Sequence, residues 1–304
     1  MNDLFAIAIH GGAGTLSRER FSTSVRQQYE NALQQALQAG LHVLQNGGRS
    51  LDAVEASVIA LEDCPLFNAG CGAVFDALGG HSMDAAIMNG STLEAGAVAG
   101  ISGFKNPIRV ARAVMEKSRY VFLSGQGASD FAREHGCAEA AADYFYTEFR
   151  YNEWKQVQEK EQQNIVEKRF GTVGAVALDR DGTLAAATST GGLTNKKYGR
   201  VGDSPVIGSG TYANNNSCAV SCTGDGEQFI QAVTAYDISC QLEYKQLTLQ
   251  DACVHTMERL GSIKGSGGLI AVDRFGNIQM PFNTEGMYRA CASSNAPTQV
   301  KIFD

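Results

Sequence analysis

The sequence predicts an α+β fold in which antiparallel-rich sheets are covered by helices. Strand-like segments are grouped, then helices follow, then strands return, an order that favours packed layers over an alternating parallel barrel. In the second half, "GTVGAVALDRDGT" and "GSGGLIAVDRFGN" each place a glycine five residues before an Asp-Arg turn. Both segments are typical of β-hairpins. Their likeness predicts that the two hairpins join one antiparallel sheet.

The first half of the chain is predicted to begin with a buried strand over residues 4–10, which the glycines of "HGGAG" should end. A helix is expected over residues 22–45, because leucines recur there at helical spacing until a Gly-Gly pair stops the pattern. The elements expected next are helix 51–62, strands 81–88 and 95–101, and helices 107–117, 129–135 and 144–165.

A composition shift just before Gly171 marks the one natural boundary of the chain. The segment "EFRYNEWKQVQEKEQQNIVEKRF" is charged, glutamine-rich and nearly free of small residues, which predicts a solvated helix that decays into a linker. From Gly171 onward the chain is rich in Gly, Ala, Val and Thr. Helices over residues 226–244 and 248–260 are expected between the two hairpins. Chains of this length commonly fold as one α/β unit, so we expect a single domain over residues 1–304.

Composition describes a globular protein and excludes several classes. The chain is 44% hydrophobic and 19% charged. A net charge of −7 without any Lys/Arg-rich run argues against nucleic-acid binding. No stretch approaches 18 uninterrupted apolar residues, and the first residues lack a basic region, so neither a membrane span nor a secretory signal is expected. The eight cysteines form no CxxC or zinc-finger spacing, which fits reduced, buried thiols in the cytoplasm.

Common enzyme signatures are missing from the sequence. There is no P-loop, HExxH, GxSxG or EF-hand pattern. Of five histidines only His10 ends a strand against a glycine loop. A structural role for His10, bonded to backbone, is favoured over a catalytic one.

Two threonines can meet across the first hairpin. A turn centred near Arg180 and Asp181 pairs residues whose numbers sum to about 361 or 362, which places Thr190 opposite Thr172 or one residue displaced. A threonine hydroxyl needs an adjacent base. If the bond before Thr172 breaks, its α-amine, with a reference pKa of about 7.7–8.0, becomes that base. Gly171 would permit the strained backbone required by such a break. The alternative is that threonine stands at these two positions only because it favours β-strands.

Two glycine-rich segments supply further polar groups. "YGRVGDSP" offers Arg200 and Asp203, which could clamp the carboxylate and the ammonium of an α-amino acid. A surface ion pair is the alternative. "SCTGDGE" offers the Thr223 hydroxyl and the Gly224 amide, which could stabilise an oxyanion. Thr223 could also serve as the N-cap of the following helix.

Seven motifs stand together in order: "HGGAG", "DCPLFNAGCG", "GTVGAVALD", "ATSTGG", "GRVGDSP", "SCTGDGE" and "PFNTEGMYRA". They resemble the plant-type asparaginases, also called isoaspartyl peptidases, of the N-terminal nucleophile (Ntn) hydrolase superfamily. The resemblance covers nearly the whole chain. It implies an αββα sandwich of antiparallel-rich sheets, autocleaved into an α subunit (1–171) and a β subunit (172–304) that assemble as (αβ)₂.

The resemblance also implies roles for individual residues. By motif position these are Thr172 as nucleophile after cleavage at Gly171, Thr190 as its tuning partner, Thr223 and Gly224 as oxyanion hole, Arg200 and Asp203 as substrate anchors, and Asn68 and Gly11 near the substrate. A structural sodium ion is implied at the loop over residues 61–71, through the backbone carbonyls of Leu61, Glu62, Cys64, Phe67, Ala69 and Cys71. No cofactor is expected for the chemistry.

The reaction that the resemblance implies is hydrolysis of asparagine or of β-linked aspartyl dipeptides through an ester on Thr172. Asp225 departs from some relatives on the leaving-group side and could disfavour acidic leaving residues. One alternative is a glycosylasparaginase, which needs room for a sugar and usually a secretory route. Another is an uncleaved, non-catalytic binding member.

Overall fold

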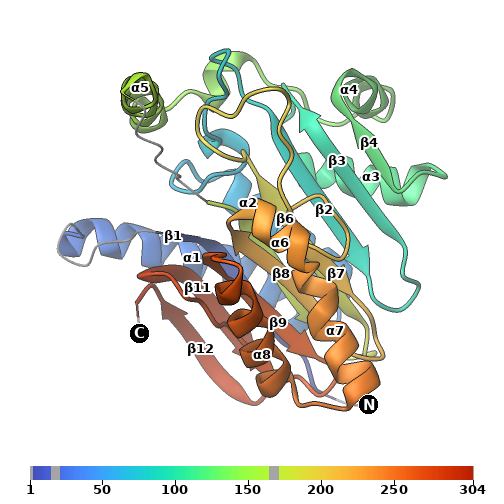
Figure 1. Cartoon of the computed structure of the whole chain (residues 1–304). Helices are drawn as coiled ribbons and strands as arrows, with labels where there is room; N and C mark the ends of the chain where they lie inside the picture. The colour runs from blue at the N-terminus through green and yellow to red at the C-terminus, as the bar shows by residue number, and fades with distance from the viewer. Residues whose placement is uncertain (1–2, 15–20, 164–170, 304) are drawn as a thin grey trace.

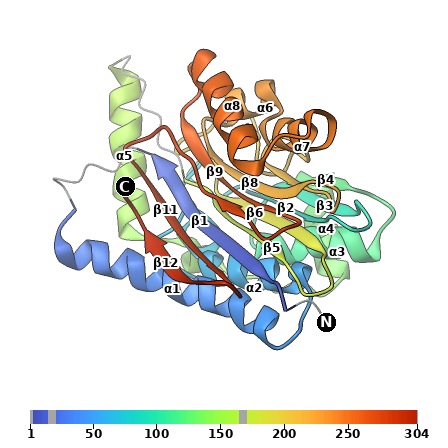
Figure 2. The same ribbon diagram turned by 90° about the horizontal axis from the view of Figure 1, so that it is seen from below.

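Two sheets lie face to face at the centre of the molecule, and helices cover their outer faces (Figures 1 and 2). The computed structural model describes residues 3–14, 21–163 and 171–303. The larger sheet has the order β12 (Ala296–Lys301), β11 (Gly286–Ser293), β1 (Ala6–Gly14), β5 (Val173–Leu178), β6 (Leu184–Thr190), β2 (Met83–Asn89), β3 (Ala95–Ile101) and β4 (Phe122–Ser124). The smaller sheet has the order β10 (Ile278–Gln279), β9 (Gly267–Asp273), β8 (Cys218–Gly224) and β7 (Thr211–Ala213). Of the described strand pairs, only β3–β4 is parallel.

Helices form the two outer layers, as Figure 2 shows. The larger sheet is covered by α1 (Thr23–Gln45), α2 (Ser50–Glu62), α3 (Pro107–Lys117) and α4 (Gly125–Glu134). The smaller sheet is covered by α6 (Gly226–Ala232), α7 (Thr234–Lys245) and α8 (Leu249–Ser262). The predicted αββα sandwich is confirmed. None of the helices in the described part of the chain is long and apolar enough to cross a membrane.

Alternation along β1 shows how one strand serves two cores. Ile7 and Ile9 point to the helices, whereas Ala6 and Ala8 point to the smaller sheet. Successive side chains of a strand face opposite sides. The small alanine side chains allow the two sheets to pack closely, and they bring the ends of β1, β5, β6 and β8 together.

The prediction that both hairpins join one sheet is wrong. The hairpin β5–β6 lies in the larger sheet, and β9–β10 lies in the smaller one. Both turns are built alike, because Asp179 and Asp273 each accept backbone N–H bonds two and four residues ahead. This local chemistry fixes a hairpin but carries no information on which sheet it joins.

Several boundaries also differ from the predictions. The strand expected to end at His10 continues to Gly14, with an irregularity between His10 and Gly12 that keeps β1 paired with β11. The helix expected over residues 226–244 is two helices, because Val233 adopts a left-handed conformation between them. Helix α4 begins before the expected residue 129, and strand β2 begins after residue 81.

The segment before the boundary is not simply a solvated helix. A short 3₁₀ turn (Ala142–Phe145) precedes α5 (Glu148–Gln162), and one face of α5 is anchored on the molecule. The Trp154 ring stacks on Phe75 at 5.5 Å, and its Nε1 donates to Asn195 Oδ1 at 3.0 Å. Arg150 and Val157 are buried. The end of the expected helix (164–165) and the expected linker up to residue 170 lie outside the described residues.

Candidate active site

Thr172 and Thr190 lie opposite each other at the ends of β5 and β6. The ladder between these strands begins with Val173 opposite Ser189. The next residues outward are Thr172 and Thr190, the pair that the turn predicts. The Thr172 Oγ1 hydroxyl donates to Thr190 Oγ1 at 3.2 Å. Both side chains are almost fully buried, with exposed fractions of 6% and 2%. The geometric prediction from the turn is therefore confirmed.

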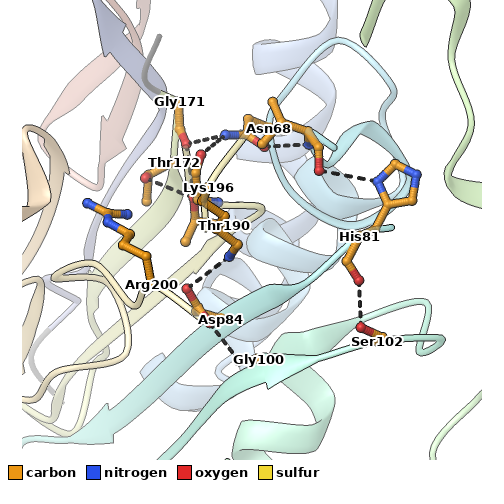
Figure 3. Close-up of polar contacts among 12 residues, drawn as sticks. Asn68, His81, Asp84, Gly100, Ser102, Gly171, Thr172, Thr190, Lys196 and Arg200 are labelled. Carbon is orange, nitrogen blue, oxygen red and sulfur yellow. Dashed lines mark hydrogen bonds and ion pairs between the residues drawn. The ribbon is translucent and has the colours of Figure 1, made fainter. Parts of the chain in front are cut away.

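The carbonyl of Gly171, directly before Thr172, is held by two donors (Figure 3). Asn68 Nδ2 donates to it at 2.9 Å and Thr190 Oγ1 at 3.0 Å. Asn68 is itself fixed, because it also donates to the Gly192 carbonyl at 2.8 Å and accepts from Val74 N at 3.0 Å. In this uncut chain Asn68 thus contacts the peptide bond before Thr172, and its expected contact with substrate stays a prediction.

The glycine run of β1 lies beside this peptide bond. Gly12 has φ of +114°, and a Cβ there would come within 3.2 Å of Gly171 Cα. Gly11, expected near the substrate, instead packs on Phe67, where a Cβ would lie 2.4 Å from the ring. Sequence reasoning singled out Gly11 and missed Gly12, although both stand in the same motif.

A small pocket opens next to Thr172. It is lined by Gly171, Thr172, Thr190, Gly192, Leu193, Arg200, Gly202, Asp203, Ser204 and Gly224. The pocket therefore brings together six of the candidate residues: Gly171, Thr172, Thr190, Arg200, Asp203 and Gly224. Thr223, Asn68 and Gly11 lie outside this lining.

Arg200 and Asp203 face the pocket without bonding to each other. Arg200 donates from Nε and Nη2 to the two carboxylate oxygens of Glu227, both at 2.9 Å. Burial raises the pKa of Asp203 to about 7, against the opposing effect of the Arg200 charge. Asp203 Oδ2 has no hydrogen-bond partner among the described residues. Sequence reasoning missed Glu227, although it is the last letter of the "SCTGDGE" motif.

Thr223 lies in β8 and is fully buried. Its Oγ1 accepts from Ala13 N at 3.3 Å, which leaves its own proton available to donate. The N-cap of α6 is Asp225, so the alternative reading of Thr223 as helix cap is wrong. Gly224 adopts φ of +147°, and a Cβ would lie 2.3 Å from the Ser266 carbonyl, which excludes a side chain there.

Comparison with known proteins places the chain in a family. The family model described as "Asparaginase" matches residues 3–302. The chain belongs to the asparaginase family. It is similar to the isoaspartyl peptidase of Escherichia coli K12, with 51% identity over 93% of this chain and 91% of the relative. The isoaspartyl peptidase of Salmonella typhimurium is 50% identical over 93% and 94%. The human isoaspartyl peptidase/L-asparaginase is 40% identical over 94% and 92%.

The loop for which a sodium ion was predicted turns back on itself beside Asn68. Gly70, with φ of +52°, approaches the Glu62 carbonyl so closely that a Cβ would lie 2.3 Å from it. Arg150 donates to the Gly72 carbonyl at 2.9 Å and approaches that of Leu66 at 3.5 Å, and neither residue belongs to the expected ligand set. No group of three His, Cys, Asp or Glu gathers as a metal site in the described ranges. The expected ligands are backbone carbonyls, a donor type that suits a hard cation, and those of Leu61, Cys64, Phe67 and Ala69 each already accept a backbone N–H. The sodium ion stays a prediction.

A buried ion pair that sequence reasoning missed lies behind the pocket. In Figure 3 the Lys196 side chain points to Asp84, at 3.7 Å between Nζ and Oδ2. Asp84 faces Thr190 in the β2–β6 ladder. Burial raises the pKa of Asp84 and lowers that of Lys196, while each charge opposes the shift of the other. The segment around Lys196 is polar, so the sequence does not indicate that this lysine is buried.

Proposed function

We propose that this protein is an autoprocessing threonine amidohydrolase that cleaves β-aspartyl (isoaspartyl) dipeptides and the side-chain amide of L-asparagine to give L-aspartate. The observation that carries the proposal is the Thr172 hydroxyl beside Thr190, with the preceding Gly171 carbonyl held by two donors. Membership of the asparaginase family and the names of its relatives support the substrate class.

The first step of the proposal is self-cleavage. Thr172 Oγ attacks the Gly171 carbonyl carbon, and the Asn68 amide and the Thr190 hydroxyl stabilise the charge that develops on its oxygen. The acyl group moves from the Thr172 nitrogen to its oxygen, which leaves an ester and a free α-amine. Water then hydrolyses the ester and restores the hydroxyl. The products are an α subunit (1–171) and a β subunit (172–304).

In the second step the free α-amine of Thr172 acts as base. An amine with a pKa of about 7.7–8.0 is partly neutral near pH 7 and can take the hydroxyl proton. Thr172 Oγ attacks the substrate amide, and the proton passes to the leaving nitrogen. A β-aspartyl ester forms on Thr172, and water releases aspartate from it. The Thr223 hydroxyl and the Gly224 N–H supply the oxyanion hole.

Arg200 and Asp203 would bind the two charged groups at the α-carbon of the substrate. Glu227 pairs with the Nε side of Arg200, so the Nη1 end can receive the substrate α-carboxylate. Asp203 offers an unpaired, buried oxygen that suits the substrate α-ammonium. Glu227 thus orients the arginine towards the pocket.

The proposal extends to the ion, the assembly and the location. The carbonyls of residues 61–71 named above would hold a sodium ion, which contributes a fixed charge to the loop that carries Asn68. Two αβ units would assemble as (αβ)₂ in the cytoplasm. Light scattering after size-exclusion chromatography tests the assembly, and flame photometry of the dialysed protein tests the ion.

A denaturing gel and one set of assays test the function. We expect two bands that sum to 32.4 kDa and release of aspartate from asparagine and from isoaspartyl dipeptides. A single band without turnover would favour the uncleaved binding protein. Faster hydrolysis of a glycosylated asparagine than of either substrate would favour the glycosylasparaginase. Either result would overturn the proposal.

A further inference from the structure

A row of polar groups crosses the interface between the two sheets directly beside Thr172. His10 of β1 faces Gly174 of β5, and Gly174 faces Thr188 of β6. Ser221 of β8, in the opposing sheet, meets this row. The remainder of the interface is formed mostly by apolar residues such as Ala8, so this polar row is an exception that invites a functional explanation.

Four short contacts connect these side chains, all of which are fully buried. His10 Nδ1 lies 3.0 Å from the Thr172 carbonyl oxygen, and His10 Nε2 lies 2.9 Å from Ser221 Oγ. Ser221 Oγ lies 2.7 Å from Thr188 Oγ1, which in turn lies 2.7 Å from Thr211 Oγ1. The chain thus runs from the candidate nucleophile to β7 of the smaller sheet.

The acceptors around His10 decide which ring nitrogen carries the proton. A carbonyl oxygen only accepts, so His10 must carry its proton on Nδ1 and donate it to Thr172. Nε2 then accepts from Ser221, and because this bond uses the single proton of Ser221, Ser221 accepts from Thr188. At the far end of the chain, the carbonyl oxygens of Gly210 and Ser204 are further acceptors for the hydroxyls of Thr188 and Thr211, at 3.3 Å and 2.9 Å. Burial lowers the pKa of His10 to about 3, which agrees with this neutral form.

Gly174 makes the room in which the chain forms. A Cβ on Gly174 would lie 2.0 Å from Ser221 Oγ and 2.5 Å from His10 Nε2. Any side chain at this position would separate the imidazole from the serine. The glycine that recurs in the two hairpin motifs is therefore required here for a contact between sheets.

The position of the His10 bond matters most once the chain is cut. The β5–β6 ladder begins at Val173, so Thr172 lies just outside it. Among the described residues, two side chains hydrogen-bond to Thr172: Thr190 holds its hydroxyl and His10 holds its carbonyl. After cleavage the covalent restraint from Gly171 is lost. The orientation of the nucleophile and its α-amine then depends on these two bonds and on the link to Val173.

We propose that His10 is a positioning residue that fixes the Thr172 main chain in the cleaved enzyme by donating from Nδ1 to its carbonyl, while Ser221 holds the imidazole in that tautomer. This inference rests on the proposed function. His10 moves no proton of the reaction, because its only N–H is committed to the carbonyl. It acts through the geometry of Thr172.

Three variants separate the two bonds of the imidazole. His10→Asn places an amide donor as many bonds from the backbone as Nδ1, so it keeps the bond to Thr172 and gives up Ser221. Ser221→Ala keeps the imidazole and removes the hydroxyl that donates to its Nε2. His10→Phe keeps a ring of similar size and loses both bonds. If the Phe variant does not fold, His10→Gln replaces it, because its longer amide reaches towards Ser221.

The readouts are kcat and KM for asparagine per cleaved, folded active site, with the extent of cleavage measured on gels. We expect kcat of His10→Phe to fall about tenfold to a hundredfold, as for a buried acceptor left unpaired, with KM unchanged because the clamp lies on another loop. His10→Asn should recover most of this loss, and Ser221→Ala should fall between them.

Two results would overturn the inference. One is a kcat of cleaved His10→Phe, or of its Gln replacement, equal to that of the wild type, which would make His10 a purely structural residue. The other is a folded His10→Asn as impaired as the Phe variant, which would deny the role of the Nδ1 donor. A wild-type protein without cleavage or turnover would overturn the proposed function itself, and so is distinguishable from both.

Discussion

Replacing Thr190 by valine tests the geometry at the Gly171–Thr172 bond most closely. The hydroxyl makes three contacts: it donates to the Gly171 carbonyl at 3.0 Å and accepts from Thr172 Oγ1 at 3.2 Å and from Gly192 N at 2.9 Å. Valine keeps the shape and removes all three. The carbonyl under attack loses one of its two donors, and such a loss costs about 10²–10³ in rate, or about 2.7–4 kcal/mol of transition-state stabilisation.

The assay is a time course of cleavage followed on denaturing gels from freshly refolded protein. We expect the half-life of the uncut chain to lengthen about 10²–10³-fold in Thr190→Val. The unpaired Gly192 N–H should also destabilise the fold by about 1–3 kcal/mol, which thermal unfolding measures separately. The two readouts separate the chemical effect from the structural one.

Thr194→Val is the matched control for this experiment. Thr194 is buried four residues further along the chain, in the segment that follows β6, and its Oγ1 has no hydrogen-bond partner in the part of the chain that the structure describes. The same substitution there should leave cleavage at the wild-type rate. Wild-type cleavage by Thr190→Val, or equally slow cleavage by both variants, would refute the reasoning.

Three further predictions concern the substrate clamp and pH. Arg200→Ala should cleave itself normally yet lose turnover of asparagine, and wild-type activity in steady-state assays would contradict the carboxylate clamp. Burial raises the pKa of Asp203 to about 7, so its carboxylate is neutralised as the pH falls below that value. KM for asparagine should therefore rise by up to about tenfold per pH unit below pH 7. A KM that is flat from pH 8 to 5 would count against the ammonium clamp. Burial lowers the pKa of His10 from 6.5 to about 3. Between these two pH values the unfolded state binds a proton on His10 that the folded state does not bind. Its contribution to stability is therefore full above pH 6.5 and should fall by about 1.4 kcal/mol per pH unit below it. Denaturant titrations across pH should show a shallower slope for His10→Phe than for the wild type.

Local patterns in the sequence were enough to predict the pairing of the two threonines. The turn at Asp179–Gly182 fixes the register of its hairpin, and the register alone places Thr190 opposite Thr172. The layered fold also followed from the grouping of strands and helices. Neither inference needed knowledge of which distant strands pair.

Contacts between distant segments could not be predicted in this way. The β9–β10 hairpin joins a different sheet because β9 pairs with β8, a long-range choice that its turn does not encode. Glu227 reaches Arg200 only after α6 packs beside the pocket loop. The prediction that His10 bonds to backbone is confirmed, but the sequence could not show that its partner is Thr172, 162 positions away.

The central claim is that the Gly171–Thr172 peptide bond opens to give a nucleophile and a base on one residue. N-terminal sequencing with intact-mass analysis of the active enzyme tests it most directly, with Thr172→Ala as the uncleaved reference. We expect two chains in the active enzyme, one of which begins at Thr172, and a single inactive chain in the variant. An active preparation that contains only the uncut polypeptide, or a variant that still cleaves, would contradict the account.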